Sequence, residues 1–107
     1  MYYITFFVPE SHLETVKNAL FEAGAGRYKN YDYCSFEVKG RGQFRPLKGS
    51  NPFLGKKNEI EKVDEYRVEM LCEKRYLKKA LKKLLEVHPY EEPAYFVVKI
   101  KTIRDIF

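Results

Sequence analysis

The chain has 107 residues, of which 45% are hydrophobic and 16% aromatic, a composition that suits a single domain spanning residues 1–107 with its own core. No apolar run approaches the ~18 residues of a transmembrane helix, and the first ten residues lack signal-peptide features, so we expect a cytoplasmic protein with no membrane partner. The net charge of +5 suggests nucleic-acid binding, but the basic residues are spread along the chain among acidic ones, which is typical of a solvated surface.

The first half of the chain predicts a strand, a helix and a second strand. Residues 2–8 ("YYITFFV") alternate with apolar side chains on both faces, as in a central strand. Residues 10–26 have apolar positions at helical spacing, a capping-box spacing from Ser11 to Glu14, and glycines at the end. In residues 31–39, we expect Cys34, Phe36 and Val38 to face the core, with Tyr33, Ser35, Glu37 and Lys39 on the opposite face.

The segment 40–61 is rich in glycine and too long for a plain loop, so we expect it to carry structure or function of its own. Residues 42–47 ("GQFRPL") favour a short extra strand, and Phe44 and Phe53 are candidate apolar anchors toward another subunit or a ligand. This excursion separates two similar halves of the chain.

The second half repeats the first. Residues 62–72 alternate as a strand, and residues 73–87 predict a helix with lysines outward and these residues inward: Leu77, Ala80, Leu81, Leu84 and Leu85. Residues 94–101 predict the last strand, and a short tail follows. Two β-α-β units indicate an α+β fold, a ferredoxin-like βαββαβ sandwich with a Gly-rich excursion between the halves.

One face of this predicted sheet lies under the helices and the other needs a partner, which is a second subunit, a ligand or RNA. We expect that other face to carry Tyr3, Thr5, Phe7, Tyr33, Glu37, Arg67 and Glu69. The third strand ("EYRVEMLC") lacks the glycine and aromatic series of an RNA-recognition motif, and its outward acids would repel phosphate. Nucleic acid is therefore an unlikely partner.

Two kinds of site find weak support in the spacing of the residues. Cys34 and Cys72 are both predicted on core faces, where a thiol is a small hydrophobe, so no catalytic residue is assigned. An anion site in the Gly-rich excursion would use the cations Arg41, Arg45, Lys48, Lys56 and Lys57, although no Walker A spacing is present. The other interpretation of the excursion is a hairpin with turn glycines.

The stretch "EVHPYEEPAY" (86–95) has two interpretations. His88, Glu91 and Glu92 are ligand types for a divalent metal ion, but three ligands within five residues rarely close a metal site without help from elsewhere. Alternatively, His88 donates to the backbone and the prolines hold the corner between a helix and a strand. We favour the corner, with a metal site completed by a neighbouring subunit as the alternative.

Three motifs carry a family resemblance: "NYDYCSF" (30–36), the series G-x-G-x-F-x-P-x-x-G-x-x-P (40–52) and "HPYEEPAY" (88–95). Together they resemble the domain inserted in the YqfO-like dinuclear-metal-centre proteins of the NGG-interacting-factor-three-like family, of which free-standing versions exist. The insert is similar to PII signal proteins and CutA, which implies a homotrimer. The family's dinuclear metal is held by a flanking domain that this chain does not contain, so its hydrolase assignment is not expected to transfer.

These observations lead to two functional hypotheses. The first is a non-enzymatic homotrimeric binding or regulatory module that senses a metal ion or a small anion, with no other cofactor and with itself as partner. The alternative is a small metal-dependent enzyme whose site lies between subunits at the HPYEEP motif.

Overall fold

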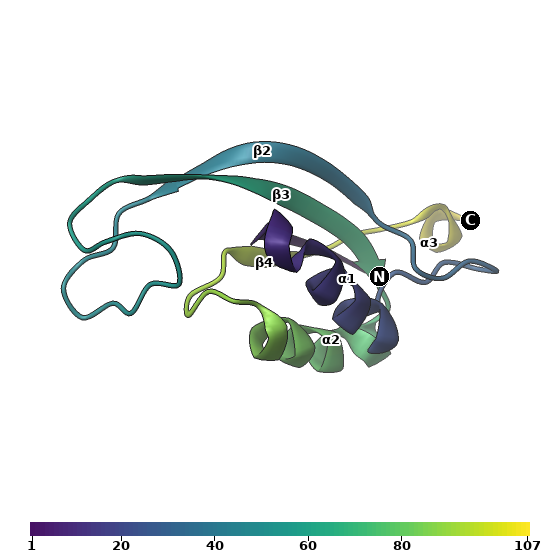
Figure 1. Ribbon diagram of the computed structural model, residues 1–107. Coiled ribbons are helices and arrows are strands. Elements are labelled where there is room, and N and C mark those ends of the chain that lie inside the picture. The colour runs from purple at the N-terminus through teal and green to yellow at the C-terminus, as the bar shows by residue number, and fades with distance from the viewer.

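The computed structural model describes residues 1–107, and its elements in chain order are β1 (Tyr2–Pro9), η1 (Glu10–His12), α1 (Leu13–Glu22), β2 (Phe36–Phe44), β3 (Glu61–Cys72), α2 (Lys74–Val87), β4 (Tyr95–Lys99) and α3 (Ile103–Ile106). The strands form a four-stranded antiparallel sheet of order β2-β3-β1-β4, and the alternating apolar residues of β1 suit its place inside this sheet. Both long helices cover one face of the sheet (Figure 1). The predicted ferredoxin-like α+β architecture is confirmed.

The core lies between the sheet and the two long helices. Ile4, Phe6 and Val8 of β1 are fully buried there. Their neighbours from the other elements are Val68, Met70 and Cys72 of β3, Val16 and Leu20 of α1, and Ala80 and Leu84 of α2. Because these residues alternate along the strands and recur at helical spacing in the helices, one apolar layer forms between sheet and helices.

The helix α1 begins later than predicted and ends as predicted. The Ser11 hydroxyl bonds Nδ1 of His12 at 2.8 Å instead of capping the helix, so the expected capping box is wrong and the helix begins at Leu13 after a 3₁₀ turn. At the other end Gly24 has φ +111°, and the ring of Tyr76 occupies the space that a Cβ would need. Glycine is therefore required where the helix stops.

The strand β2 differs from its prediction in both position and facing. Glu37 lies on the helix side, where its carboxylate accepts a 2.7 Å hydrogen bond from Lys17 Nζ, whereas Phe36 and Val38 lie on the helix-free face. The predicted faces are therefore inverted, because a strand read one residue out of phase presents every side chain to the wrong side. Cys34, expected on a core strand face, lies half-buried in the segment before β2.

The strands β2 and β3 continue beyond β1 as a projecting hairpin. The pairs from Arg41↔Asp64 to Phe44↔Glu61 have no neighbour in β1, whose pairing with β3 ends at Pro9↔Glu65. Of the expected extra strand at 42–47, only residues 42–44 are strand and they form the end of β2, whereas residues 45–60 form the loop at the hairpin end. The molecule measures 51 × 23 × 21 Å, and its radius of gyration of 15.1 Å exceeds the ~13 Å of a compact domain this size.

The second helix and the C-terminal segment follow the prediction with two differences. Leu85 is 51% exposed instead of inward, and Val87 packs against the core. The last strand is shorter than expected, although Ile100 N–H still donates to the Met1 carbonyl at 3.0 Å. None of the helices is both long enough and apolar enough to cross a membrane.

Candidate functional site

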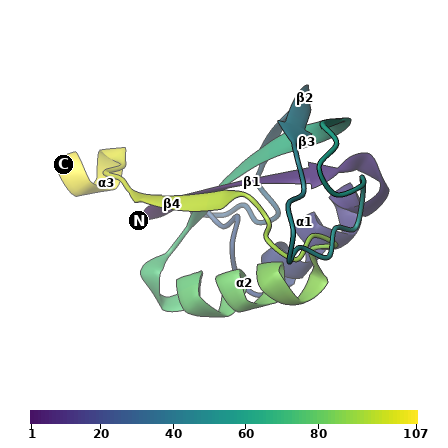
Figure 2. The ribbon, with the colours of Figure 1, turned by 90° about the vertical axis from the view of Figure 1, so that its left-hand side faces the viewer.

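Two segments distant in the sequence meet at the hairpin end. The loop 45–60 folds back beside the turn between α2 and β4 (Figure 2), and Asn51 N–H donates to the Glu91 carboxylate at 2.6 Å. The rings of Phe44 and Phe53 each lie 6.2 Å from the ring of Tyr90. Both candidate anchors of the excursion therefore pack against the HPYEEP turn of the same chain.

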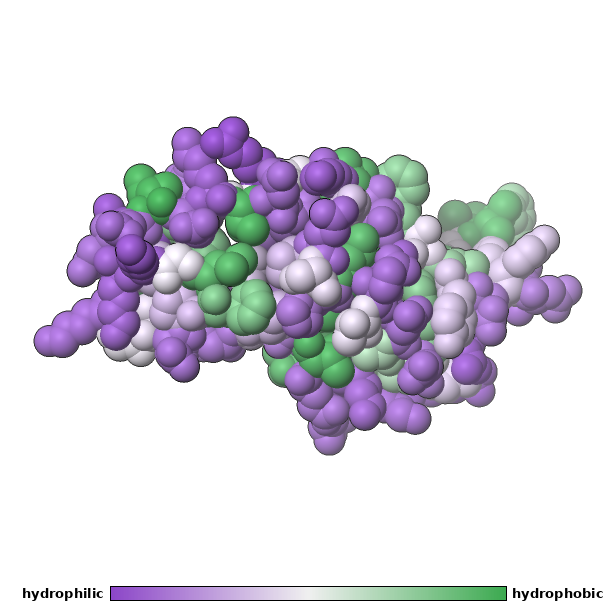
Figure 3. Space-filling view, viewed as in Figure 1, coloured by the Kyte–Doolittle hydropathy of each residue, from purple (hydrophilic) through white to green (hydrophobic).

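These segments enclose a cleft of about 330 Å³. Its apolar lining comprises Phe7, Phe44, Pro46, Pro52, Phe53, Leu54 and Ala94. Its polar lining comprises Gln43, Ser50, Glu65, Tyr90, Glu91 and Glu92. Hydrophobic residues interrupt the hydrophilic surface at the hairpin end (Figure 3). A mostly apolar cavity of this size with a few converging polar groups is the usual form of a small-ligand site.

Two polar groups of the cleft have no partner. The Tyr90 hydroxyl is buried without a hydrogen bond, and burial, followed by the charges of Glu65 and Glu61, raises the pKa of this phenol to about 12. The Glu65 carboxylate forms no ion pair in the structure, and burial raises its pKa above the usual value. It lies over Gly42, where a Cβ would collide with it.

His88 lies beneath the cleft and holds the backbone corner. Its side chain is buried, its Nε2 lies 2.7 Å from the Phe7 carbonyl oxygen, and its Nδ1 accepts from Tyr90 N–H at 3.1 Å. Because a carbonyl only accepts and an amide N–H only donates, these partners require the neutral Nε2–H tautomer. Burial, partly opposed by the Phe7 carbonyl, lowers the pKa of His88 below its usual value and keeps the ring neutral.

The structure does not bring the three predicted metal ligands together within one chain. Glu91 and Glu92 line the cleft, whereas both ring nitrogens of His88 face backbone partners below it. No group of three His, Cys, Asp or Glu side chains is placed to hold a metal ion. A metal site completed by a second copy stays a prediction.

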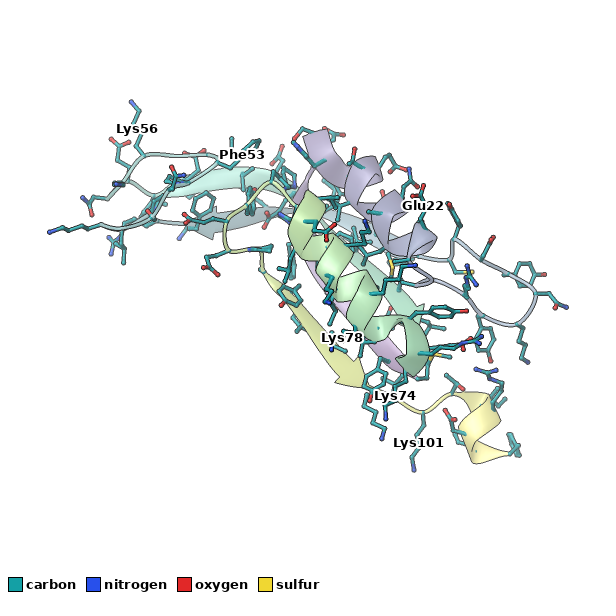
Figure 4. All side chains as sticks on the ribbon, turned by 90° about the horizontal axis from the view of Figure 1, so that it is seen from below. Glu22, Phe53, Lys56, Lys74, Lys78 and Lys101 are labelled. Atoms are coloured by element: carbon teal, nitrogen blue, oxygen red, sulfur yellow. The ribbon has the colours of Figure 1, made fainter.

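The cations proposed for an anion site are dispersed. Arg41 lines a second hollow of about 190 Å³, together with Arg67 and Glu65. The other four, Arg45, Lys48, Lys56 and Lys57, are exposed and line neither cavity, and Lys56 projects from the outer end of the hairpin (Figure 4). The larger cleft contains three glutamates and no basic residue, so its charge does not suit an anion.

The comparisons with known proteins identify where such a domain occurs. No family model matches the chain. The protein named GTP cyclohydrolase 1 type 2 homolog from Halalkalibacterium halodurans is 43% identical over 95 residues, which cover 89% of this chain and 26% of that protein. The crystal structure of a Bacillus cereus protein related to NIF3 superposes with TM-score 0.81 and 36% identity over 94% of this chain and 26% of its own.

The chain is homologous to one domain-length segment of these NIF3-related proteins. It spans about a quarter of their length, so the activity in their name belongs to the longer proteins. The PII-like protein CutA from a Nostoc species shares the fold, with TM-score 0.70 and 16% identity over 99% of this chain and 89% of its own. The resemblance predicted from the three sequence motifs is confirmed.

The sequence motifs predicted that the HPYEEP turn and the excursion of this NIF3-related segment matter, but not that they contact each other. Tyr90 was not predicted as a site residue, although it lies in the HPYEEP motif between two prolines that fix the backbone around it. No sequence pattern indicated Glu65 as a site residue, because it joins the cleft only through the pairing of β2 with β3.

Proposed function

We propose that this chain is a non-enzymatic, self-associating binding module of PII/CutA-like fold that works as a homotrimer, with the cleft as its ligand site. The observation that carries the self-association is the helix-free face of the sheet. Phe36 and Val38 of β2 are 64% and 40% exposed, and Phe96 and Val98 of β4 are 52% and 50% exposed. An exposed sheet face with apolar side chains on both outer strands is typical of an interaction surface.

A second copy of the chain suits this face better than a highly charged partner. The register places Tyr3 and Phe7 of β1 between the exposed residues of β2 and β4 on the same face. The face also carries Arg67 and Glu69, which pair with each other at 3.1 Å. Because these charges are already compensated, the face is largely apolar and close to neutral, which favours contact with an identical face.

The cleft supplies the binding function of the module. Phe7 and Glu65 share the helix-free side of the sheet with this face and also line the cleft, so assembly and ligand binding involve neighbouring residues. The three cleft glutamates favour a cation over the small anion considered from the sequence. A metal ion would need further ligands from a neighbouring copy, since one chain does not assemble three.

Size-exclusion chromatography with light scattering tests the assembly. We expect a mass about three times the 12.7 kDa of the chain. The double variant Phe36→Lys with Val98→Lys should dissociate the trimer, because it places two charges on the apolar face, whereas Lys39→Gln on the other face of β2 should leave it intact. A monomeric wild-type protein at micromolar concentration would remove the basis for the proposal.

A further inference from the structure

The cleft contains a half-buried carboxylate without an ion-pair partner and a buried hydroxyl without a hydrogen bond. Glu65 forms no ion pair, and the Tyr90 hydroxyl is fully buried without a hydrogen bond. A polar group withdrawn from water without a partner costs free energy, and a charged one costs more. Such groups are normally satisfied by something that occupies the site.

The surroundings of these two groups indicate the chemistry of the occupant. Phe7, Phe44 and Phe53 line the cleft beside the ring of Tyr90, and aromatic faces attract cations as well as apolar groups. No lysine, arginine or histidine lines the cleft to compensate Glu65, Glu91 and Glu92. Glu91 already accepts from Asn51 N–H, and Glu92 is exposed, which leaves Glu65 as the half-buried charge without a partner.

We propose that the cleft binds a small protonated primary amine with an apolar body, whose ammonium group lies between the Glu65 carboxylate and the Tyr90 hydroxyl. The proposal rests on the proposed function of the domain as a binding module and adds the class of ligand. An ammonium group has three N–H donors, so it can satisfy the Glu65 oxygens and the Tyr90 oxygen together. The apolar body then fills the space between Phe44 and Phe53.

Other ligand classes satisfy the site less well. An anion would face three glutamates. A neutral ligand would leave the Glu65 charge uncompensated in a partly apolar cavity. A divalent metal ion needs several oxygen ligands in a defined geometry, and the cleft does not assemble three carboxylates around one point.

Titration calorimetry with 2-phenylethylamine as the probe tests the inference. Matched probes are 2-phenylethanol, which lacks the charge, and 3-phenylpropanoate, which reverses it. We expect the amine to bind with a dissociation constant of about 1 mM or below and the other two to bind at least tenfold more weakly. Glu65→Gln should weaken amine binding by about tenfold or more, and Tyr90→Phe by roughly three- to tenfold. Glu59→Gln removes one charge from the same hairpin outside the cleft and should change nothing.

Four outcomes would overturn the inference: no binding of the amine by the wild-type protein, equal binding of amine and alcohol, an unchanged affinity in Glu65→Gln, or binding of Mg²⁺ or Zn²⁺ in place of the amine. All the lining residues come from one chain, so a monomeric wild-type protein that binds the amine would refute the trimer and support the ligand class.

Discussion

Replacing His88 by alanine distinguishes two roles of this residue, as part of a structural corner or as a metal ligand. In the structure the imidazole joins the end of α2 to β1 through the Phe7 carbonyl and receives the Tyr90 N–H. The alanine variant removes both hydrogen bonds and empties the volume of a side chain that is only 6% exposed. The same variant should therefore lower stability regardless of any metal ion.

The expected loss can be worked out from these contacts. Two hydrogen bonds contribute about 0.5–1.5 kcal/mol each, and a backbone group left without a partner or an unfilled cavity adds further cost, so we expect about 2–4 kcal/mol. In a domain of this size each kcal/mol lowers Tm by roughly 4–8 °C, which places the variant roughly 10–30 °C below the wild type. His12→Ala is the matched control, because that ring has one exposed hydrogen bond, to the Ser11 hydroxyl, and a T-shaped contact with Phe53, and it should cost less than about 1 kcal/mol.

Thermal unfolding followed by circular dichroism compares the two variants with the wild type, and titration with Zn²⁺ measures metal binding to the wild type and to His88→Ala. If His88→Ala unfolds within about 1 kcal/mol of the wild type, the corner does not depend on the ring and the reasoning is wrong. If the wild type also binds Zn²⁺ and the variant does not, the metal hypothesis for His88, Glu91 and Glu92 replaces it.

Three further predictions follow from individual side chains. Because folding lowers the pKa of His88, the unfolded chain takes up a proton on this residue first as the pH falls, near pH 6.5. The stability advantage of the wild type over His88→Ala should therefore be complete above that pH and decline in acid. An advantage that grew in acid would contradict the neutral ring. Burial, followed by the charge of Glu73, raises the pKa of the Cys72 thiol to about 11. Iodoacetamide at neutral pH should therefore label the half-buried Cys34 before Cys72, as followed by mass spectrometry. Equal labelling of the two would argue against the buried position of Cys72. Gly42→Ala should displace the Glu65 carboxylate and weaken 2-phenylethylamine binding, while Gly40→Ala, whose Cβ meets nothing within 4 Å, should not; equal losses of affinity would show that glycine flexibility, and not the carboxylate position, matters.

Local periodicity was enough to predict most of the fold. In β1 and β3 apolar residues alternate, and in α1 and α2 they recur at helical spacing, so the spacing identifies the side chains that each element buries. The order of these elements along the chain then predicts the ferredoxin-like arrangement. The three family motifs were equally readable, because they consist of residues adjacent in the chain.

The facing of β2 and the cleft were decided only by the tertiary structure. Residues 31–39 alternate in a way that suits either face, and pairing with β3 together with the Lys17–Glu37 ion pair selects the face that exposes Phe36. The cleft depends on a loop that folds back across about 40 positions of sequence, so that Asn51 reaches Glu91. Sequence patterns report which side chains a single element must bury, whereas contacts between separate segments depend on strand register and on where the chain turns back, which are set by packing of the whole domain.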